Sequence, residues 1–155
     1  MKNVLFFGVM LAVMAGPSAN AGGCDDDGYT NRLSAQQIAN RLSNRRVLAT
    51  GSGGGDWKED HCSTDPGVPG ALYKVGAGTT VDPRAFRGTW TPRAGGDQNP
   101  PRVVYNYTVG GSSSFAFSVW RNNTTNGLCW EDLNGQKVAV APAPQNIPGG
   151  PCDIP

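Results

Sequence analysis

Large apolar residues occupy every second position in two stretches of the chain, 102–109 and 114–120. Alternation with a period of two is typical of β-strands that bury one face. The connector at 110–113 reads Gly-Gly-Ser-Ser, which favours a tight turn between two alternating runs. Together the two stretches predict a β-hairpin.

A second hairpin is predicted where Asn134 and Gly135 stand between the apolar-rich runs 128–133 and 136–140. Asn-Gly supplies the two positive φ angles that a type I′ turn requires. Clusters of Gly and Pro separate further strand candidates. These candidates are 46–49, 57–62, 71–75 and 86–91. Since about seven or eight short strands follow one another, we expect an all-β fold, an antiparallel meander that forms a small barrel or a sandwich.

One segment near the start of the domain predicts a helix. Ser34 and Gln37 have the spacing of a capping box, in which each side chain bonds the main-chain N–H of the other residue. Ile38 and Leu42 follow as an i, i+4 apolar stripe. We expect a short amphipathic helix at about 35–43 that covers one end or one face of the sheet.

The first residues have the layout of a secretory signal peptide. An apolar run at 4–15 follows a single Lys and ends before a Gly-Pro pair and a small-x-small site. The run is too short for the roughly 20 residues of a membrane-spanning helix. We therefore expect a signal peptide at 1–21 with cleavage after Ala21, no membrane span, and a single periplasmic or secreted domain at 22–155.

Lipidation at Cys24 is the alternative, because this cysteine closely follows the cleavage region. The residue three positions before it is Ala21, whereas lipoproteins usually have Leu there. Lipidation would also leave an odd number of cysteines for disulfides. Simple cleavage is therefore the favoured interpretation.

Cys24, Cys62, Cys129 and Cys152 predict two disulfides in a small exported domain. In a meander, neighbours in sequence stay neighbours in space. This favours Cys24 with Cys62 and Cys129 with Cys152, one of the three possible connectivities. The second bond would tie down a Pro- and Gly-rich tail at 141–155, which has few apolar residues of its own.

The net charge of the domain limits the classes of molecule that it can bind. Without residues 1–21, twelve basic side chains face twelve acidic ones, so the net charge of the domain is near zero. Nucleic acids and anionic membranes select clustered Lys and Arg. We therefore expect no nucleic-acid partner.

Six short motifs follow one another through 22–155. They are Leu33-Ser34-x-x-x-Ile38-x-x-x-Leu42, Gly88-Thr89-Trp90, Val104-Tyr105-x-Tyr107, Ser114-x-Ala116-x-Ser118-Val119, Gly127-Leu128-Cys129 and a terminal Cys152. In this order they resemble small exported proteins of proteobacteria whose function is uncharacterised. The resemblance implies a Gram-negative source and a periplasmic or extracellular location, and it implies no catalytic residues.

Gly88-x-Trp90 is also similar to the G-x-W motif of lipocalins, and this resemblance implies a barrel-like fold. In lipocalins the motif lies on the first barrel strand after a short helix. Here strand candidates precede it, so only the barrel-like shape is carried over.

His61 is the only histidine, and it stands in the cluster Glu59-Asp60-His61-Cys62. In a strand, Glu59 and His61 share one face while Asp60 and Cys62 share the other. A zinc site needs three or four suitable ligands, and the cysteines are better used in disulfides. We therefore expect a solvated strand end beside a disulfide, and no metal.

Other catalytic patterns are weak. The run Asp25-Asp26-Asp27 lacks the spaced ligands of a calcium loop, so we expect a solvated N-terminal arm. No G-x-S-x-G elbow serves a hydrolase, and Glu59 and Glu131 are the only glutamates for a carboxylate pair. The sequence predicts no catalytic residue and no cofactor.

Tryptophans are the best remaining indication of function. One interpretation is core packing, because Trp is usually largely buried. The other is that some of them lie on an open face, where they stack on a sugar or bind a protein. The candidate binding aromatics are Trp90, Trp120, Trp130, Tyr105 and Tyr107, and Trp57 is the remaining tryptophan.

We therefore expect a non-catalytic binding module of the bacterial envelope or exterior, such as an inhibitor or a binder of a glycan or small ligand. Its partner would be a protein or a glycan of that environment, or a small molecule. One alternative is a structural envelope component in which every tryptophan is packed. The other is a small secreted hydrolase in which His61 or a carboxylate pair lines a pocket.

Overall fold

The computed structural model describes residues 22–76, 84–109, 111–148 and 152. The expected signal peptide at 1–21 and its cleavage site lie outside these residues. The described chain has one α-helix, α1 (Ala35–Leu42), and a 3-10 turn, η1 (Asp25–Asp27). Its strands, in chain order, are β1 (Asn31–Arg32), β2 (Arg45–Gly51), β3 (Asp56–His61), β4 (Gly70–Lys74), β5 (Ala85–Arg93), β6 (Arg102–Tyr107), β7 (Ser113–Arg121), β8 (Leu128–Glu131), β9 (Lys137–Ala141) and β10 (Gln145–Asn146).

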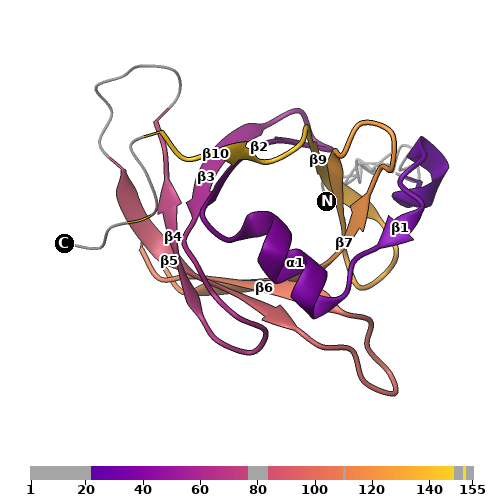
Figure 1. The fold of residues 1–155 in the computed structure, drawn as a ribbon, viewed down its shortest axis with the longest axis horizontal. Helices are drawn as coiled ribbons and strands as arrows, with labels where there is room; N and C mark the ends of the chain where they lie inside the picture. Colours follow the sequence, from indigo (N-terminus) through magenta and orange to yellow (C-terminus); the bar gives the residue numbers. More distant parts are fainter. Residues whose placement is uncertain (1–21, 77–83, 110, 149–151, 153–155) are drawn as a thin grey trace, which may run out of the picture.

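Eight of these strands, β2 to β9, form a closed antiparallel barrel (Figure 1). Each strand pairs with the next along the chain, and β9 closes the ring on β2, with Thr50 opposite Val140. The predicted antiparallel meander is confirmed, and of the two predicted architectures the barrel is the correct one. The two-residue strands β1 and β10, which the sequence did not predict, extend the sheet beside β7 and β2.

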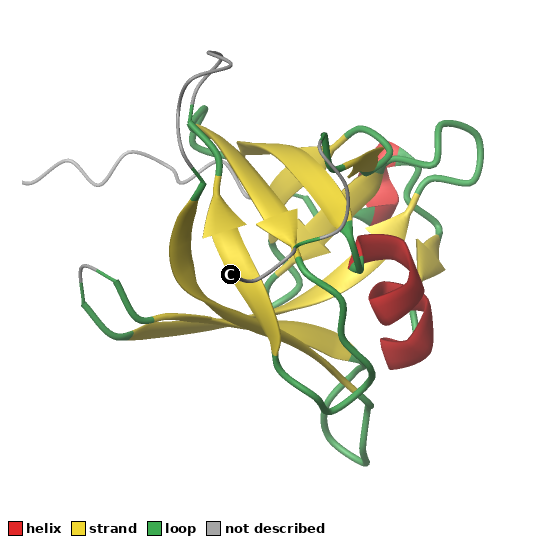
Figure 2. Cartoon of the chain, turned by 60° about the vertical axis from the view of Figure 1, so that its left-hand side comes forward, coloured by secondary structure: helices red, strands yellow, loops and turns green. Residues whose placement is uncertain are grey.

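Helix α1 forms where the capping box predicted it. The Ser34 hydroxyl accepts from the Gln37 main-chain N–H at 3.2 Å, and the Gln37 side chain accepts from the Ser34 N–H at 2.8 Å. The helix lies across one end of the barrel and turns Ile38 and Leu42 into it (Figures 1 and 2). Across the described ranges, no helix has the length and apolar character needed to cross a membrane.

The interior of the barrel is filled by side chains. The core that α1 closes is made of buried apolar groups from the helix, from the residue that follows β1, and from strands β2 and β4 to β9. Its members are Leu33, Ile38, Leu42, Val47, Ala49, Leu72, Trp90, Val103, Tyr105, Val119, Leu128, Trp130, Ala139 and Ala141. The end of the barrel away from α1, where β2 ends and β3 begins, is called the open end below.

The turn between β8 and β9 differs from the predicted type I′ turn. Gly135 has a positive φ of 78°, but Asn134 does not have a positive φ. The Asp132 side chain accepts from the main-chain N–H groups of Asn134 at 2.9 Å and Gln136 at 2.8 Å. These bonds stabilise a longer connection whose one positive-φ position is the glycine.

The predicted disulfide connectivity is wrong. Cys24 is bonded to Cys129, and Cys62 is bonded to Cys152. The strand alternation places Cys62 and Cys129 on the outer face of the barrel, where the two chain ends pass. Each bond therefore fastens one terminal arm to the outside of a different strand. The presence of two disulfides indicates a protein of an oxidising compartment, outside the cytoplasm.

The tail at 141–155 is held by more than its cysteine. Its first residue, Ala141, belongs to β9, and β10 pairs with the start of β2. Ile147 is buried, and the carbonyl oxygen of Pro148 accepts from Arg84 at 3.0 Å. The tail therefore lies along the outside of the barrel as far as Pro148, and Cys152 is bonded to Cys62.

Candidate functional site

A surface pocket of about 640 Å³ lies at the open end of the barrel. Pockets of about 300–1,000 Å³ are typical of small-molecule sites. The pocket is formed by residues of β2, β3 and β4, by the two residues after β4, and by the first residue after β9. Its lining is Leu48, Ala49, Thr50, Asp56, Trp57, Lys58, Lys74, Val75, Gly76 and Pro142.

The β2–β3 hairpin sets the positions of six of the ten lining residues. In its register, Ala49 stands opposite Trp57 and Leu48 opposite Lys58. A tight turn joins the strands, with the Gly51 N–H bonded to the Gly55 carbonyl oxygen at 2.7 Å. Because the hydrogen bonds between these strands fix the backbone, the Cα positions of Trp57 and Lys58 are fixed as well.

Strand β4 contributes the other side of the pocket. Lys74 pairs with Glu59 of β3, and the Val75 N–H bonds the Lys58 carbonyl oxygen at 2.9 Å. Pro142 enters from the start of the C-terminal tail, which the Cys62–Cys152 bond secures.

The lining combines an apolar surface with separated charges. Val75 is buried, and the half-buried Trp57 packs against the core of the barrel. Lys58, Lys74 and Asp56 supply the charges. Among the described residues, none of these three makes an ion pair within 4.0 Å. The pocket can therefore take a ligand with both apolar and charged parts.

Glu59 lies on the same face of the sheet as Lys74 and is 7% exposed. It accepts a hydrogen bond of 2.9 Å from the Tyr107 hydroxyl. Burial raises the pKa of Glu59 to about 7, although the Tyr107 bond and the positive charge of Lys74 act in the opposite direction. The carboxyl therefore changes charge close to neutral pH.

A polar group of three side chains lies inside the barrel. The Tyr105 hydroxyl is 3.1 Å from His61 Nε2 and accepts from Trp130 Nε1 at 3.2 Å. Burial lowers the pKa of His61 to about 4, so its ring is neutral at physiological pH, and burial raises the pKa of Tyr105. His61 is 1% exposed. This group stabilises the interior and does not reach solvent through His61.

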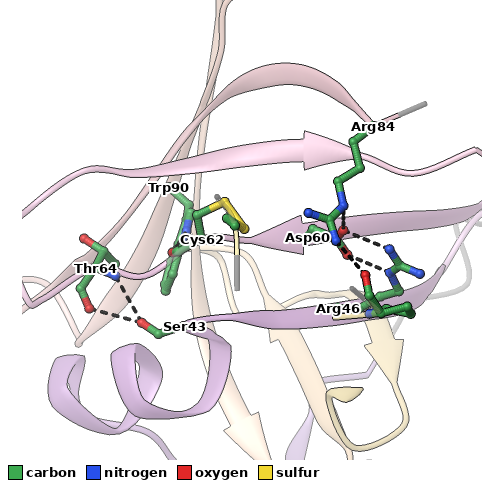
Figure 3. The surroundings of a disulfide bond; sticks show 9 residues. Ser43, Arg46, Asp60, Cys62, Thr64, Arg84 and Trp90 are labelled. Carbon is green, nitrogen blue, oxygen red and sulfur yellow. Dashed lines mark hydrogen bonds and ion pairs between the residues drawn. A yellow bond between two sulfur atoms is a disulfide. The ribbon is translucent and has the colours of Figure 1, made fainter. Parts of the chain in front are cut away.

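The expectation of a solvated strand end at 59–62 is wrong, because Glu59, Asp60 and His61 are all buried. The predicted division of faces is nevertheless correct. Glu59 and His61 bond the inward-facing tyrosines, whereas Asp60 binds Arg46 and Arg84 (Figure 3). The tail is linked to this cluster, because Arg84 also bonds the carbonyl oxygen of Pro148.

The predicted binding aromatics do not gather on one exposed face. Trp90, Trp130 and Tyr105 are buried in the core, which corrects their placement on an open face. Tyr107 is half-buried beside Glu59. Trp120 is half-buried elsewhere, under the Arg32 guanidinium, whose Cζ lies 4.4 Å from the ring centroid.

Sequence reasoning missed the pocket residues Trp57, Lys58 and Lys74. The available signal was the position of Trp57 two residues after the glycine-rich turn, since such turns lie at the ends of a barrel. The acidic run is solvated as expected, because Asp25, Asp26 and Asp27 are exposed. Within the described residues no cluster of three or more acidic, His or Cys side chains is arranged to hold a metal ion.

A row of aromatic rings on β6 and β7 reaches solvent at the same end. Tyr107 contacts Phe115, and Phe115 stacks on Phe117, with ring centroids 6.0 and 6.3 Å apart. Phe115 and Val109 are each 49% exposed. This row is a second apolar surface, separate in its residues from the pocket.

Comparisons with protein-family models, with curated proteins and with solved structures found no match for this chain.

Proposed function

We propose that this chain is a non-catalytic, exported binding module and that the pocket at the open end is its ligand site. The pocket itself is the observation that carries the proposal. It has the volume of a small-molecule site, apolar lining residues together with Trp57, and a few charged residues without ion-pair partners among the described residues.

The scaffold supports this function because it holds the lining in place before a ligand arrives. A closed barrel leaves its strands little freedom, and the two disulfides link residues 105 and 90 positions apart in the chain. A preformed site avoids much of the entropy cost of binding. The disulfides and the signal-like segment at 1–21 support a periplasmic or secreted location.

A structural role in the cell envelope is the first alternative, and the burial of Trp90 and Trp130 in the core is consistent with it. Under this alternative the protein would bind no ligand saturably. The hydrolase alternative expects His61 to line a pocket, whereas His61 bonds Tyr105 inside the barrel and is absent from the lining described above.

A neutral fluorescent probe tests the proposal. N-phenylnaphthylamine brightens in apolar sites, and Trp57 would transfer excitation energy to it. We expect saturable binding that Trp57→Ala weakens and that Trp120→Ala leaves unchanged. Phe115→Ser is a second control, because it alters the exposed aromatic row and not the pocket. Binding that depends on Trp120 or Phe115, or no saturable binding, would contradict this site.

A further inference from the structure

We propose that the Cys62–Cys152 disulfide is a site of reversible thiol–disulfide exchange with an external dithiol, and that the Cys24–Cys129 disulfide is not. This reactivity is separate from the proposed ligand site and does not depend on it. It follows from the exposure of the four cysteines, from the way Cys62 is held in the barrel, and from the contacts of the tail before Cys152.

The two disulfides differ in their access to solvent. Cys24 and Cys129 are each 0% exposed, and the Cys24 N–H donates to the buried Glu131 carboxylate at 3.2 Å. Cys62 is 4% exposed, whereas Cys152 is half-buried. Exchange requires a thiolate to reach a disulfide sulfur, and accessible disulfides are the ones that react. Cys152 is therefore the point of attack.

The exchange takes place in two steps. A thiolate of the external dithiol attacks the Cys152 sulfur, forms a mixed disulfide with it, and displaces Cys62 as a thiolate that takes up a proton. The second thiolate of the reagent then attacks the reagent's own sulfur in this mixed disulfide and displaces Cys152, which is also protonated. The protein gains two electrons and two protons, and the dithiol is oxidised to a disulfide.

Cys62 is held in the barrel by bonds that do not involve the tail. Its N–H donates to the Ala71 carbonyl oxygen at 2.9 Å, and its own carbonyl oxygen accepts from Trp90 Nε1 at 3.0 Å (Figure 3). The main-chain position of Cys62 is therefore set by its neighbours in the sheet. It should not change when the disulfide is reduced.

The tail is also held near Cys62 by contacts other than the disulfide. Strand β10 pairs with the start of β2, and Ile147 is 5% exposed. The Pro148 carbonyl oxygen accepts from Arg84 at 3.0 Å. Cys152 follows Pro148 by four residues, so the two thiols of the reduced protein stay at a high effective concentration. Reoxidation should therefore restore the same pair.

Timed reduction tests the difference between the two disulfides. The disulfide-bonded domain is treated with dithiothreitol, free thiols are trapped at intervals with N-ethylmaleimide, and peptide mapping locates them. We expect Cys62 and Cys152 to be labelled about tenfold faster than Cys24 and Cys129. Equal rates, or faster labelling of Cys24 and Cys129, would overturn the proposal.

A monothiol identifies the sulfur that is attacked. Glutathione leaves a mixed disulfide on the attacked cysteine when the reaction is quenched with acid and the remaining thiol is alkylated. We expect glutathione on Cys152 and the alkyl group on Cys62. Glutathione on Cys62 would overturn the assignment of the attack to the tail.

Ile147→Ser tests whether the tail contacts favour reoxidation. In this variant the Cys62–Cys152 bond should be half reduced at a several-fold lower ratio of reduced to oxidised dithiothreitol, because the tail is held less firmly. Leu133→Ser removes an apolar side chain that is 55% exposed in the β8–β9 turn, and it should behave as the native protein. Circular dichroism checks folding, and Ile147→Ala replaces a serine variant that does not fold. An unchanged ratio in a folded Ile147 variant would overturn the role of these contacts.

Discussion

The indole N–H of Trp90 donates a hydrogen bond of 3.0 Å to the main-chain carbonyl oxygen of Cys62. This bond joins β5 to the end of β3 across β4, beside the disulfide that fastens the C-terminal tail (Figure 3). It passes next to Gly70. A Cβ atom at Gly70 would lie 2.9 Å from both Trp90 Nε1 and the Cys62 oxygen.

Gly70→Ala should therefore destabilise the barrel. The added methyl group would push the indole from its partner and leave a buried N–H without an acceptor, which costs about 1–3 kcal/mol. Gly96→Ala is the matched control, because no atom lies within 4 Å of its added Cβ. Urea unfolding of both variants measures the difference, and equal free energies of unfolding would contradict this account.

Removing each disulfide should lower stability to a similar extent but affect binding differently. The chain-entropy model gives about 5 kcal/mol for loops of these lengths. Loss of Cys62–Cys152 through paired Ser substitutions removes one of the contacts that hold the tail, which β10 and Ile147 also hold, so probe binding beside Pro142 should weaken. Loss of Cys24–Cys129 should leave binding intact in protein that remains folded. Peptide mapping without reduction checks the two linkages, and the reverse pattern of binding would contradict the role of the tail.

Glu59 and His61 should give opposite pH dependences to stability. Burial raises the pKa of Glu59 from 4.5 to about 7, so its contribution is fully present below pH 4.5 and is lost as pH rises through 7. Burial lowers the pKa of His61 from 6.5 to about 4, so its contribution is present above pH 6.5 and is lost as pH falls through 4. Each contribution amounts to about 3 kcal/mol.

Glu59→Gln isolates the first of these contributions. The stability of the native protein relative to the variant should be greater at pH 4 than at pH 8 by about 3 kcal/mol. The reason is that the native carboxyl is neutral only at the lower pH. Urea unfolding over this pH range gives the difference, with Asp56→Asn as an exposed-carboxylate control. A constant difference between the native protein and Glu59→Gln would contradict burial of this group.

Asp60→Asn should be strongly destabilising. The substitution removes the negative charge between Arg46 and Arg84 and leaves two guanidinium groups without their partner. Breaking a buried ion pair on one side typically costs about 3–5 kcal/mol, here reduced because both arginines reach solvent in part. Asp65→Asn, at an exposed position, is the control in thermal and urea unfolding. If both variants unfold alike, the cluster does not stabilise the barrel.

Local patterns in the sequence were sufficient for the elements of the fold. The capping box at Ser34 and Gln37 predicted α1, and the alternation at 102–109 and 114–120 predicted β6 and β7. Because these signals act between residues that are close along the chain, they can be read without knowledge of the tertiary structure.

Features that depend on closure of the barrel were not predictable in this way. Cys24 meets Cys129 because the N-terminal arm passes over the outside of β8, and no local pattern encodes that path. Asp60 was expected to be solvated, because the sequence does not show that Arg46 and Arg84 meet it on the outside of the barrel. Lys58 and Lys74, which are far apart in the sequence, come near each other only through the pairing of β3 with β4.

The central claim is that a ligand occupies the pocket beside Trp57. The most direct measurement is a ¹H–¹⁵N correlation spectrum of the disulfide-bonded domain, recorded during titration with N-phenylnaphthylamine. The indole N–H signals report separately on Trp57 in the pocket, on Trp120 outside it, and on Trp90 and Trp130 in the core. The account predicts a saturable shift of the Trp57 signal with the other three nearly unchanged. A shift confined to Trp120, or no saturable shift at Trp57, would contradict it.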